Sequence, residues 1–244
     1  MESNYEYKYL SQIYDVCKSS FWDNYFIRIN SFFTTPPKRV LDLGCGTGLA
    51  INHLNCSPNH YIGVDASEAM LQVAKKKFPA FDFQLESILM FNQAREFDLV
   101  LSAFDTMNHL LNINDWQKAF RTARHHLSAE GYFIFDVVTQ HDHQFNWPGQ
   151  VNVTESNEWL YIQKSEFENE KKVACLKNTI FLKEKNFWLR FDEEIHQISL
   201  PISTIMELLR YEDLECCQIL DLETGSAPKN SSTTILFVCK VKTN

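Results

Sequence analysis

A short apolar run that breaks into a glycine-rich turn, residues 40–48 (VLDLGCGTG), constrains this chain most. Three of the seven glycines in the 244 residues lie within residues 44–48, and apolar residues continue at helical spacing to residue 54. We predict a buried strand over residues 39–43, a tight turn and a helix. Because glycine has no side chain, such a turn lets its backbone approach a ligand, which the first amides of the helix can receive.

Two classes of ligand use a turn of this kind, and Asp42 distinguishes between them. A dinucleotide places a pyrophosphate on the helix N-terminus, whereas S-adenosylmethionine carries a sulfonium and an ammonium. A carboxylate at position 42 repels a pyrophosphate and attracts a sulfonium or an ammonium. The interaction energy of each charge pair is roughly 4 kcal/mol at about 4 Å and an effective dielectric of about 20. The dinucleotide fingerprint also needs a third glycine where Leu49 stands. The turn therefore favours S-adenosylmethionine over a nicotinamide dinucleotide.

Two segments carry a resemblance to a known family. Residues 42–48 (DLGCGTG) closely resemble motif I of the class I S-adenosylmethionine-dependent methyltransferases, and residues 63–71 (GVDASEAML) resemble motif II. The resemblance implies a cofactor site made of Asp42, Gly44, Cys45 and Gly46 at the methionine end, Asp65 at the ribose, Ala66, Met70, Glu86, Ser87 and Ile88 at the adenine, and Trp22 and Ala103 nearby.

The position of Asp65 supports its predicted role independently. It ends the predicted second strand, 17 residues after Gly48, about where an α/β nucleotide-binding fold places a carboxylate on ribose hydroxyls. The alternative is an acid that only caps the next helix, which we expect to begin at Ser67. Glu86 stands where family members usually carry aspartate, and a solvated loop glutamate is its alternative.

Two further segments resemble a small-molecule subgroup that includes sugar-amine N-methyltransferases. These are Tyr14-Asp15 followed by Phe21-Trp22, and residues 104–110 (FDTMNHL). The resemblance implies that His109 is catalytic, as a general base or orienting group, with Tyr14 as a second contact. A histidine beside two leucines can equally be a buried structural residue. Lys18 stands where the sugar-amine enzymes carry a tyrosine, which departs from that subgroup.

The order of the predicted elements indicates an α/β fold. Strands at 60–64, 81–85, 97–102 and 132–138 alternate with helices, which predicts a parallel sheet. Alternating residues over 151–200 predict an antiparallel sheet with one wet face. With the resemblance, we expect a Rossmann-like, seven-stranded, mostly parallel sheet with helices on both faces, an N-terminal helical cap and an inserted antiparallel β lobe. In chain order, the expected units are the cap 1–35, the cofactor-binding core 36–150, the lobe 151–200 and the C-terminal helix and hairpin 201–244.

Composition limits the kinds of partner and the cellular compartment that we expect. The net charge of −8 and pI of about 5.5 argue against a broad nucleic-acid surface. No apolar run approaches the roughly 18 residues of a membrane span, and the seven cysteines contain no Cys-x-x-Cys pair, so we expect a cytoplasmic protein with reduced thiols. His141 and His143 alternate, yet spacing supplies no third ligand, so no metal is predicted. His196 could reach the pocket or lie on the surface of the sheet.

These observations predict an enzyme that moves the methyl group of S-adenosylmethionine to nitrogen or oxygen of a small-molecule acceptor, leaving S-adenosylhomocysteine. The resemblance also allows a homodimer through the β lobe. One alternative is a non-catalytic subunit that binds S-adenosylmethionine. Another is a methyltransferase acting on a protein or tRNA, against which the acidic charge argues, as does Ser102-Ala103-Phe104-Asp105 where an Asn-Pro-Pro-Tyr motif would stand.

Overall fold

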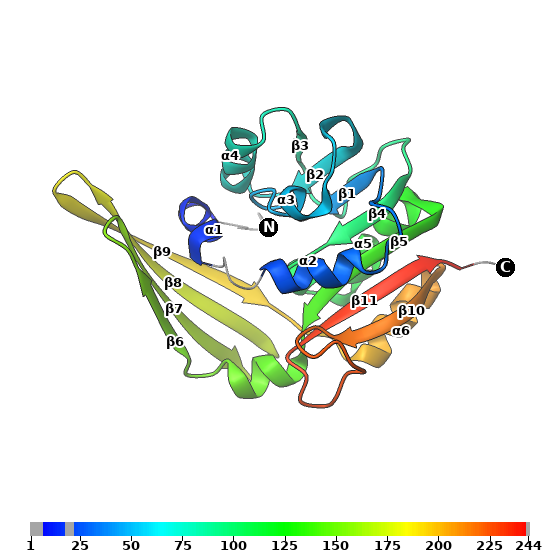
Figure 1. Cartoon of the computed structure of the whole chain (residues 1–244). Coiled ribbons are helices and arrows are strands. Elements are labelled where there is room, and N and C mark those ends of the chain that lie inside the picture. Colours follow the sequence, from blue (N-terminus) through cyan, green and yellow to red (C-terminus); the bar gives the residue numbers. More distant parts are fainter. Residues whose placement is uncertain (1–6, 18–21, 243–244) are drawn as a thin grey trace.

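A seven-stranded sheet forms the centre of the protein (Figure 1), as seen in a computed structural model that describes residues 7–17 and 22–242, without the side chains of 22–24. Its strand order is β10-β11-β5-β4-β1-β2-β3. The strands are β1 (Val40–Leu43), β2 (Tyr61–Asp65), β3 (Asp82–Leu85), β4 (Phe97–Ser102), β5 (Leu127–Val138), β10 (Leu214–Asp221) and β11 (Thr234–Val241). β1 to β5 pair in parallel, and β11 runs antiparallel to both of its neighbours. The predicted fold class is confirmed.

Helices cover both faces of this sheet because side chains along each strand alternate between two cores. In β1, Leu41 and Leu43 pack in the core that includes Trp116 of α5 and Ile205 of α6. Val40 points to the opposite core, which is built with residues of the other helices. The helices of the first face are α5 (Ile113–His126) and α6 (Ile202–Tyr211), and those of the second are α2 (Trp22–Asn30), α3 (Ala50–Leu54) and α4 (Glu68–Lys77).

Polar caps start two of these helices. The Ser67 hydroxyl accepts from the backbone amide of Met70 at 3.3 Å and caps α4, as predicted. With Gln117 three residues on, Asn114 has the sequence pattern of a capping box and is predicted to cap α5, and this prediction is wrong. Asn112 caps that helix instead, accepting from the Asp115 amide at 3.0 Å while its own amide group donates to the Asp115 carboxylate. The capping pair therefore begins two residues earlier than the sequence pattern indicated.

The N-terminal segment is less helical than its apolar spacing predicts. It contains a 3₁₀ turn η1 (Leu10–Gln12) and the single turn α1 (Tyr14–Cys17) before α2 begins. The backbone amides of Tyr9 and Leu10 donate to the Glu193 carboxylate, at 2.5 and 3.4 Å, instead of to helical carbonyls. Leu10 and Ile13 are buried in a core shared with the four-stranded sheet. This tertiary contact, and not a long amphipathic helix, holds the segment.

The inserted segment forms the predicted antiparallel lobe, with β6 (Val151–Glu155), β7 (Trp159–Glu168), β8 (Val173–Glu184) and β9 (Phe187–Gln197) in that order. It extends to one side of the large sheet (Figure 1). Along β9, Glu193, Ile195 and Gln197 are buried while Glu194 and His196 are exposed. One face of the lobe therefore covers the N-terminal segment and the other meets solvent.

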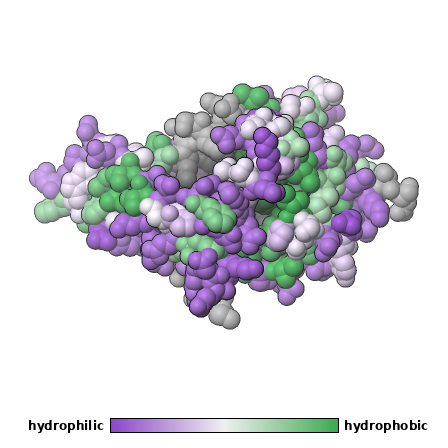
Figure 2. Space-filling view, turned by 90° about the horizontal axis from the view of Figure 1, so that it is seen from below, coloured by the Kyte–Doolittle hydropathy of each residue, from purple (hydrophilic) through white to green (hydrophobic). Residues whose placement is uncertain are grey.

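Seen from below, much of the surface is hydrophilic, with hydrophobic patches both at the end that holds the lobe and over the half that holds the large sheet (Figure 2). The lobe exposes Val151 and Val153 on its edge strand β6, at 56% and 58%. Among the described residues, none of the helices is long and apolar enough to cross a membrane.

Candidate active site

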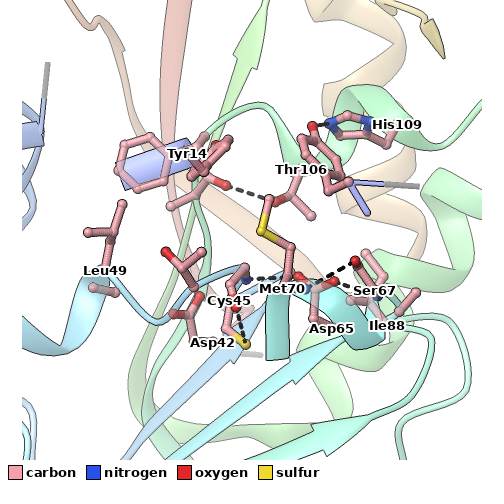
Figure 3. A pocket seen from close by; sticks show the side chains of 18 of the residues that line it. Tyr14, Asp42, Cys45, Leu49, Asp65, Ser67, Met70, Ile88, Thr106 and His109 are labelled. Atoms are coloured by element: carbon pink, nitrogen blue, oxygen red, sulfur yellow. Dashed lines mark hydrogen bonds between the residues drawn. The ribbon is translucent and has the colours of Figure 1, made fainter. Parts of the chain in front are cut away.

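A pocket opens at the carboxyl ends of β1, β2 and β4 (Figure 3). Here the chain leaves β1 for β2 on one side and has β4 on the other, which is the switch point where open α/β sheets place ligands. The pocket holds about 910 Å³ of empty space, counting its mouth, enough for a small cofactor together with an acceptor. Its lining residues are Tyr7, Tyr14, Asp42, Gly44, Cys45, Gly46, Thr47, Leu49, Ala50, Asp65, Ala66, Ser67, Met70, Ser87, Ile88, Ala103, Phe104, Thr106, His109 and Leu110.

The glycine loop forms one wall of this pocket. The amides of Gly44 and Cys45 both donate to the carbonyl of Val64, at 2.7 and 3.0 Å, which ties the loop to β2. Gly44 has a φ of +81°, and a Cβ there would lie 2.3 Å from Cγ2 of Thr106. The position is thus limited to glycine both by its backbone conformation and by the close approach of the loop after β4.

Asp65 lies at the end of β2, and its carboxylate holds the glycine loop by hydrogen bonding. Its two carboxylate oxygens accept from the amides of Gly46 and Ser67, each at 2.8 Å. Burial raises the pKa of Asp65, although these two amide bonds act in the opposite direction. Each oxygen keeps a further lone pair, so the carboxylate can accept from two hydroxyl groups of a ligand in the pocket.

Asp42 is a second buried acid of the pocket, with 2% of its surface exposed. The Tyr61 hydroxyl donates to one of its oxygens at 2.7 Å. Burial raises its pKa to about 7, with a smaller contribution from the charge of Asp65 and an opposing one from the Tyr61 hydrogen bond. A cationic ligand beside Asp42 would lower this pKa and stabilise the charged carboxylate, so this end of the pocket favours positive charge.

His109 lies across the pocket from these acids, on the same side as Tyr14 (Figure 3). Its Nε2 lies 3.1 Å from the hydroxyl of Tyr7, and the Tyr7 ring also packs edge-on against Tyr14 at 5.9 Å between centroids. Burial lowers the pKa of His109, and burial raises the pKa of Tyr7. The Tyr7 phenol therefore stays protonated, and the His109 imidazole stays neutral near pH 7. The phenol O–H can then donate a hydrogen bond to the unprotonated ring nitrogen.

A polar network behind His109 fixes its surroundings. The Gln197 side-chain amide donates to Asp105 and lies 3.4 Å from Nε2 of His109. The Gln197 carbonyl oxygen lies 3.1 Å from Nε2 of His143, whose Nδ1 meets the Ser199 hydroxyl at 2.7 Å. His143, one of the two alternating histidines, thus has both of its nitrogens occupied by protein groups and supports the site from the β9 side.

The loop that carries His109 is anchored by Asp136 of β5. Phe104 and Asp105 have φ values of +60° and +53°, a left-handed conformation that non-glycine residues seldom adopt. The Asp136 carboxylate accepts from both of their amides, at 2.7 and 3.0 Å, and from the Tyr25 hydroxyl at 2.7 Å. Burial raises the pKa of Asp136 to about 7, and the nearby charge of Asp105 adds to this rise. These bonds hold the strained turn that brings His109 to the pocket.

The N-terminal segment is attached to the glycine loop and to α4 through Asp15 of α1. Its carboxylate accepts from the Thr47 hydroxyl of the glycine loop and from the ammonium of Lys77 at the end of α4. Lys77 also donates to the Thr47 carbonyl at 3.1 Å. The segment 7–17 is thereby joined to the cofactor-binding side of the pocket as well as to the lobe.

Most of the predicted site residues meet at this pocket, and their roles remain predictions. The pocket lining includes His109, Tyr14, Asp42, Gly44, Cys45, Gly46, Asp65, Ala66, Met70, Ser87, Ile88 and Ala103. Glu86 does not line it, and its backbone amide donates to the Asp65 carbonyl at 3.1 Å. The Trp22 side chain and all of Lys18 lie outside the described residues. His196 lies on the exposed face of β9, pointing away from the buried Gln197 side.

Three residues of the site escape prediction from the sequence. Tyr7 is one of several tyrosines near the start of the chain, and no motif distinguishes it. Gln197 and Asp136 reach the loop after β4 from 92 and 31 or 32 positions away. Asp136 alone could have been noticed in the sequence, because it lies within an apolar run. An acid buried in such a run needs hydrogen-bond donors around it.

Comparison with known proteins agrees with this geometry. Residues 40–131 match the family model described as methyltransferase domain. The Bacillus subtilis protein YqeM, named as a methyltransferase, is 25% identical over 203 residues, or 82% of each chain.

Two solved structures share the whole architecture. An S-adenosylmethionine-dependent methyltransferase from Clostridium acetobutylicum has a TM-score of 0.82 at 23% identity, covering 96% of this chain and 98% of its own. The sugar N-methyltransferase KedS8 from Streptoalloteichus has a TM-score of 0.74 at 18% identity, covering 95% and 92%. At these identities the likeness concerns the fold. The chain therefore has the class I S-adenosylmethionine-dependent methyltransferase fold, matches the methyltransferase domain model over residues 40–131 and resembles the sugar-amine N-methyltransferases in architecture.

Proposed function

We propose that this protein transfers the methyl group of S-adenosylmethionine to a nitrogen or oxygen of a small-molecule acceptor. The observation that carries the proposal is the position of two acids, the buried Asp42 and the half-buried Asp65, across one pocket from a neutral histidine, His109. The acids suit a cationic cofactor with ribose hydroxyls. The histidine suits an acceptor that must lose a proton.

The residues present fit the cofactor. Gly44 and Gly46 leave a wall without side chains, and a Cβ at Gly46 would meet nothing within 4 Å, so the space beside it is free for a ligand. Asp42 favours positive charge at its end of the pocket, and Asp65 has lone pairs to spare. Met70 and Ile88 supply buried apolar surface beside Asp65, as a flat base requires.

When bound, S-adenosylmethionine supplies a methyl group on a sulfonium, which is already a good leaving group. The task left to the protein is to align the acceptor and exclude water. The Tyr7 and Tyr14 rings, packed edge-on at 5.9 Å, cover the pocket from the N-terminal side. His109 Nε2, which lies 3.1 Å from the Tyr7 hydroxyl, can take the acceptor proton once the acceptor displaces that hydroxyl.

The nature of the acceptor follows from the same residues. Asp105, Gln197 and Tyr7 surround His109 with hydrogen-bonding groups, which favours a polar acceptor bearing amine or hydroxyl groups. The structural relative KedS8 is a sugar N-methyltransferase, which supports an amine acceptor of this kind. The exposed Val151 and Val153 on the edge strand β6 support the predicted homodimer through the lobe.

Calorimetric titration with S-adenosylhomocysteine tests the cofactor assignment, with NADH as the control. We expect micromolar binding of the first and none of the second, since Asp42 opposes a pyrophosphate. Binding of NADH alone would contradict the assignment. Binding of S-adenosylhomocysteine without turnover of amines, amino sugars or hydroxylated acceptors would favour the alternative of a non-catalytic subunit.

His109→Ala separates chemistry from cofactor binding. We expect turnover to fall by about 10²–10⁴-fold, the usual contribution of a general base, with little change in S-adenosylhomocysteine affinity. Because burial lowers the His109 pKa, the base form predominates down to below the usual pH 6.5 of histidine. The turnover rate of the wild type should therefore fall only below about pH 6.5. The residual rate of His109→Ala should not show this decrease at acid pH.

The matched control is His125→Ala. His125 is an exposed histidine of α5 that does not line the pocket. The readout is release of S-adenosylhomocysteine as a function of pH, with an acceptor found in the panel above. Equal losses of turnover and cofactor affinity in His109→Ala would remove its role as a base and leave it a structural residue.

A further inference from the structure

A group of metal-ligand side chains lies on the solvent face of the lobe, apart from the pocket. Cys175 of β8 and Glu194 and His196 of β9 place one donor atom each within 4.8 Å of one another. Cys175 and His196 are directly opposite in the antiparallel register, and Glu194 is two residues from His196 and so shares its face. The strand pairing itself therefore assembles the three side chains.

The chemistry of the three donors matches one class of ion. A thiolate, an imidazole and a carboxylate are the ligands that Zn²⁺ takes in proteins, whereas Mg²⁺ and Ca²⁺ take oxygen alone. Cys175 is a free cysteine, and Nε2 of His196 lies 4.0 Å from a carboxylate oxygen of Glu194. Tetrahedral Zn²⁺ at its usual bond lengths places its donors about 3.5 Å apart. Glu194 and His196 are exposed, so small side-chain rotations can close the remaining gap.

The surrounding charges favour a cation. Lys177, the neighbour of Cys175 on the same face, is engaged by Glu166 at 2.7 Å, and Glu166 is itself opposite Cys175 in the register. Lys177 is also directly opposite Glu194 in the register, but its ammonium is bound by Glu166, while the carboxylate of Glu194 remains beside the thiol. We propose that Cys175, Glu194 and His196 bind a Zn²⁺ ion, with water in the fourth position.

Such an ion would hold the strand that contacts the loop of His109. The residues that alternate with Glu194 and His196 are Glu193 and Gln197, which face the opposite side of β9. Glu193 accepts from the Tyr9 and Leu10 amides of the N-terminal segment, and Gln197 contacts the loop of His109. Zinc bound across β8 and β9 therefore holds the register of a strand whose inner face supports the candidate active site.

The test uses the full chain without a polyhistidine tag, freed of metal with a chelator. Titration with Co²⁺ should give a thiolate-to-cobalt charge-transfer band and tetrahedral visible bands at one equivalent, and Zn²⁺ should displace them. In Cys175→Ser and His196→Gln, affinity for Zn²⁺ should fall at least about tenfold, because even outer partners of metal ligands are worth 10–100-fold.

Matched controls are Cys217→Ser, an exposed cysteine of β10, and His125→Gln, an exposed histidine of α5. Both should bind Zn²⁺ as the wild type does. Absence of one-to-one binding, unchanged affinity in the two ligand variants, or an equal loss in the controls would each overturn the site. Thermal unfolding without metal checks that the variants fold, and His196→Gln, on an exposed side chain, remains informative if Cys175→Ser does not. The titrations contain no cofactor, so their outcome is independent of the proposed methyl transfer.

Discussion

Gly44→Ala should destabilise the protein by about 2–5 kcal/mol, which combines about 1–2 kcal/mol for a left-handed alanine with about 1–3 kcal/mol for overpacking. The two contributions have separate structural sources. The φ of +81° sets the first, and the second comes from a Cβ placed 2.3 Å from Cγ2 and 2.6 Å from Oγ1 of Thr106. Urea unfolding followed by circular dichroism measures the sum. The variant should also bind S-adenosylhomocysteine weakly, since a shifted loop misplaces the Gly46 amide.

Gly149→Ala is the matched control, because Gly149 has nearly the same φ of +80°, and a Cβ added there would meet nothing within 4 Å. It should show only the backbone cost of about 1–2 kcal/mol. Adding Thr106→Ala to Gly44→Ala removes both of the closest atoms. The double variant should be more stable than the sum of the single changes by about 1 kcal/mol or more. Equal costs for Gly44→Ala and Gly149→Ala would show that the loop after β4 does not press on the glycine turn.

Asp65→Ala should weaken S-adenosylhomocysteine binding by about 1–3 kcal/mol, the cost of losing charge-assisted hydrogen bonds. We expect the upper end of this range, because the carboxylate also accepts from the amides of Gly46 and Ser67, at 2.8 Å each. Removing it therefore loosens the glycine loop and the start of α4 together. Asp65→Asn should not rescue binding, since one end of an amide donates and cannot accept from a backbone N–H.

Calorimetry measures the affinities, and Glu68→Ala serves as the control. Glu68 is an exposed acid in the first turn of the same helix α4, so its removal changes the local charge without touching the pocket. Unchanged affinity in Asp65→Ala would contradict the ribose assignment and leave Asp65 as a capping acid. A loss of the same size in Glu68→Ala would show that net charge, not hydrogen bonding, is responsible.

The parts of this protein that can be predicted from its sequence are those set by local pattern. The strand, turn and helix around residues 40–54 follow from apolar runs interrupted by glycine, and Ser67 caps α4 as its position suggests. Because β1, β2 and β4 run in parallel, residues at their carboxyl ends must meet at one edge of the sheet. That rule alone brings Asp42, Asp65 and Ala103 together.

The parts that escape prediction depend on contacts between distant residues. The Tyr7 hydroxyl meets His109 across 102 positions, and Gln197 reaches Asp105 across 92. No local periodicity encodes such pairs, since they arise only when the N-terminal segment and β9 come together with the loop after β4. The helix predicted for the N-terminal segment is too long for the same reason, because Glu193 captures amides that a helix would have used internally.

The attachment of residues 7–17 at two places has a consequence for kinetics. Asp15 binds the glycine loop and Lys77, while Leu10 and Ile13 are buried against the lobe. A ligand that enters past this segment must wait for both attachments to release, so exchange is governed by a local opening equilibrium of the segment and not by diffusion. For the proposed methyl transfer, the residues that control this opening therefore lie outside the reacting centre.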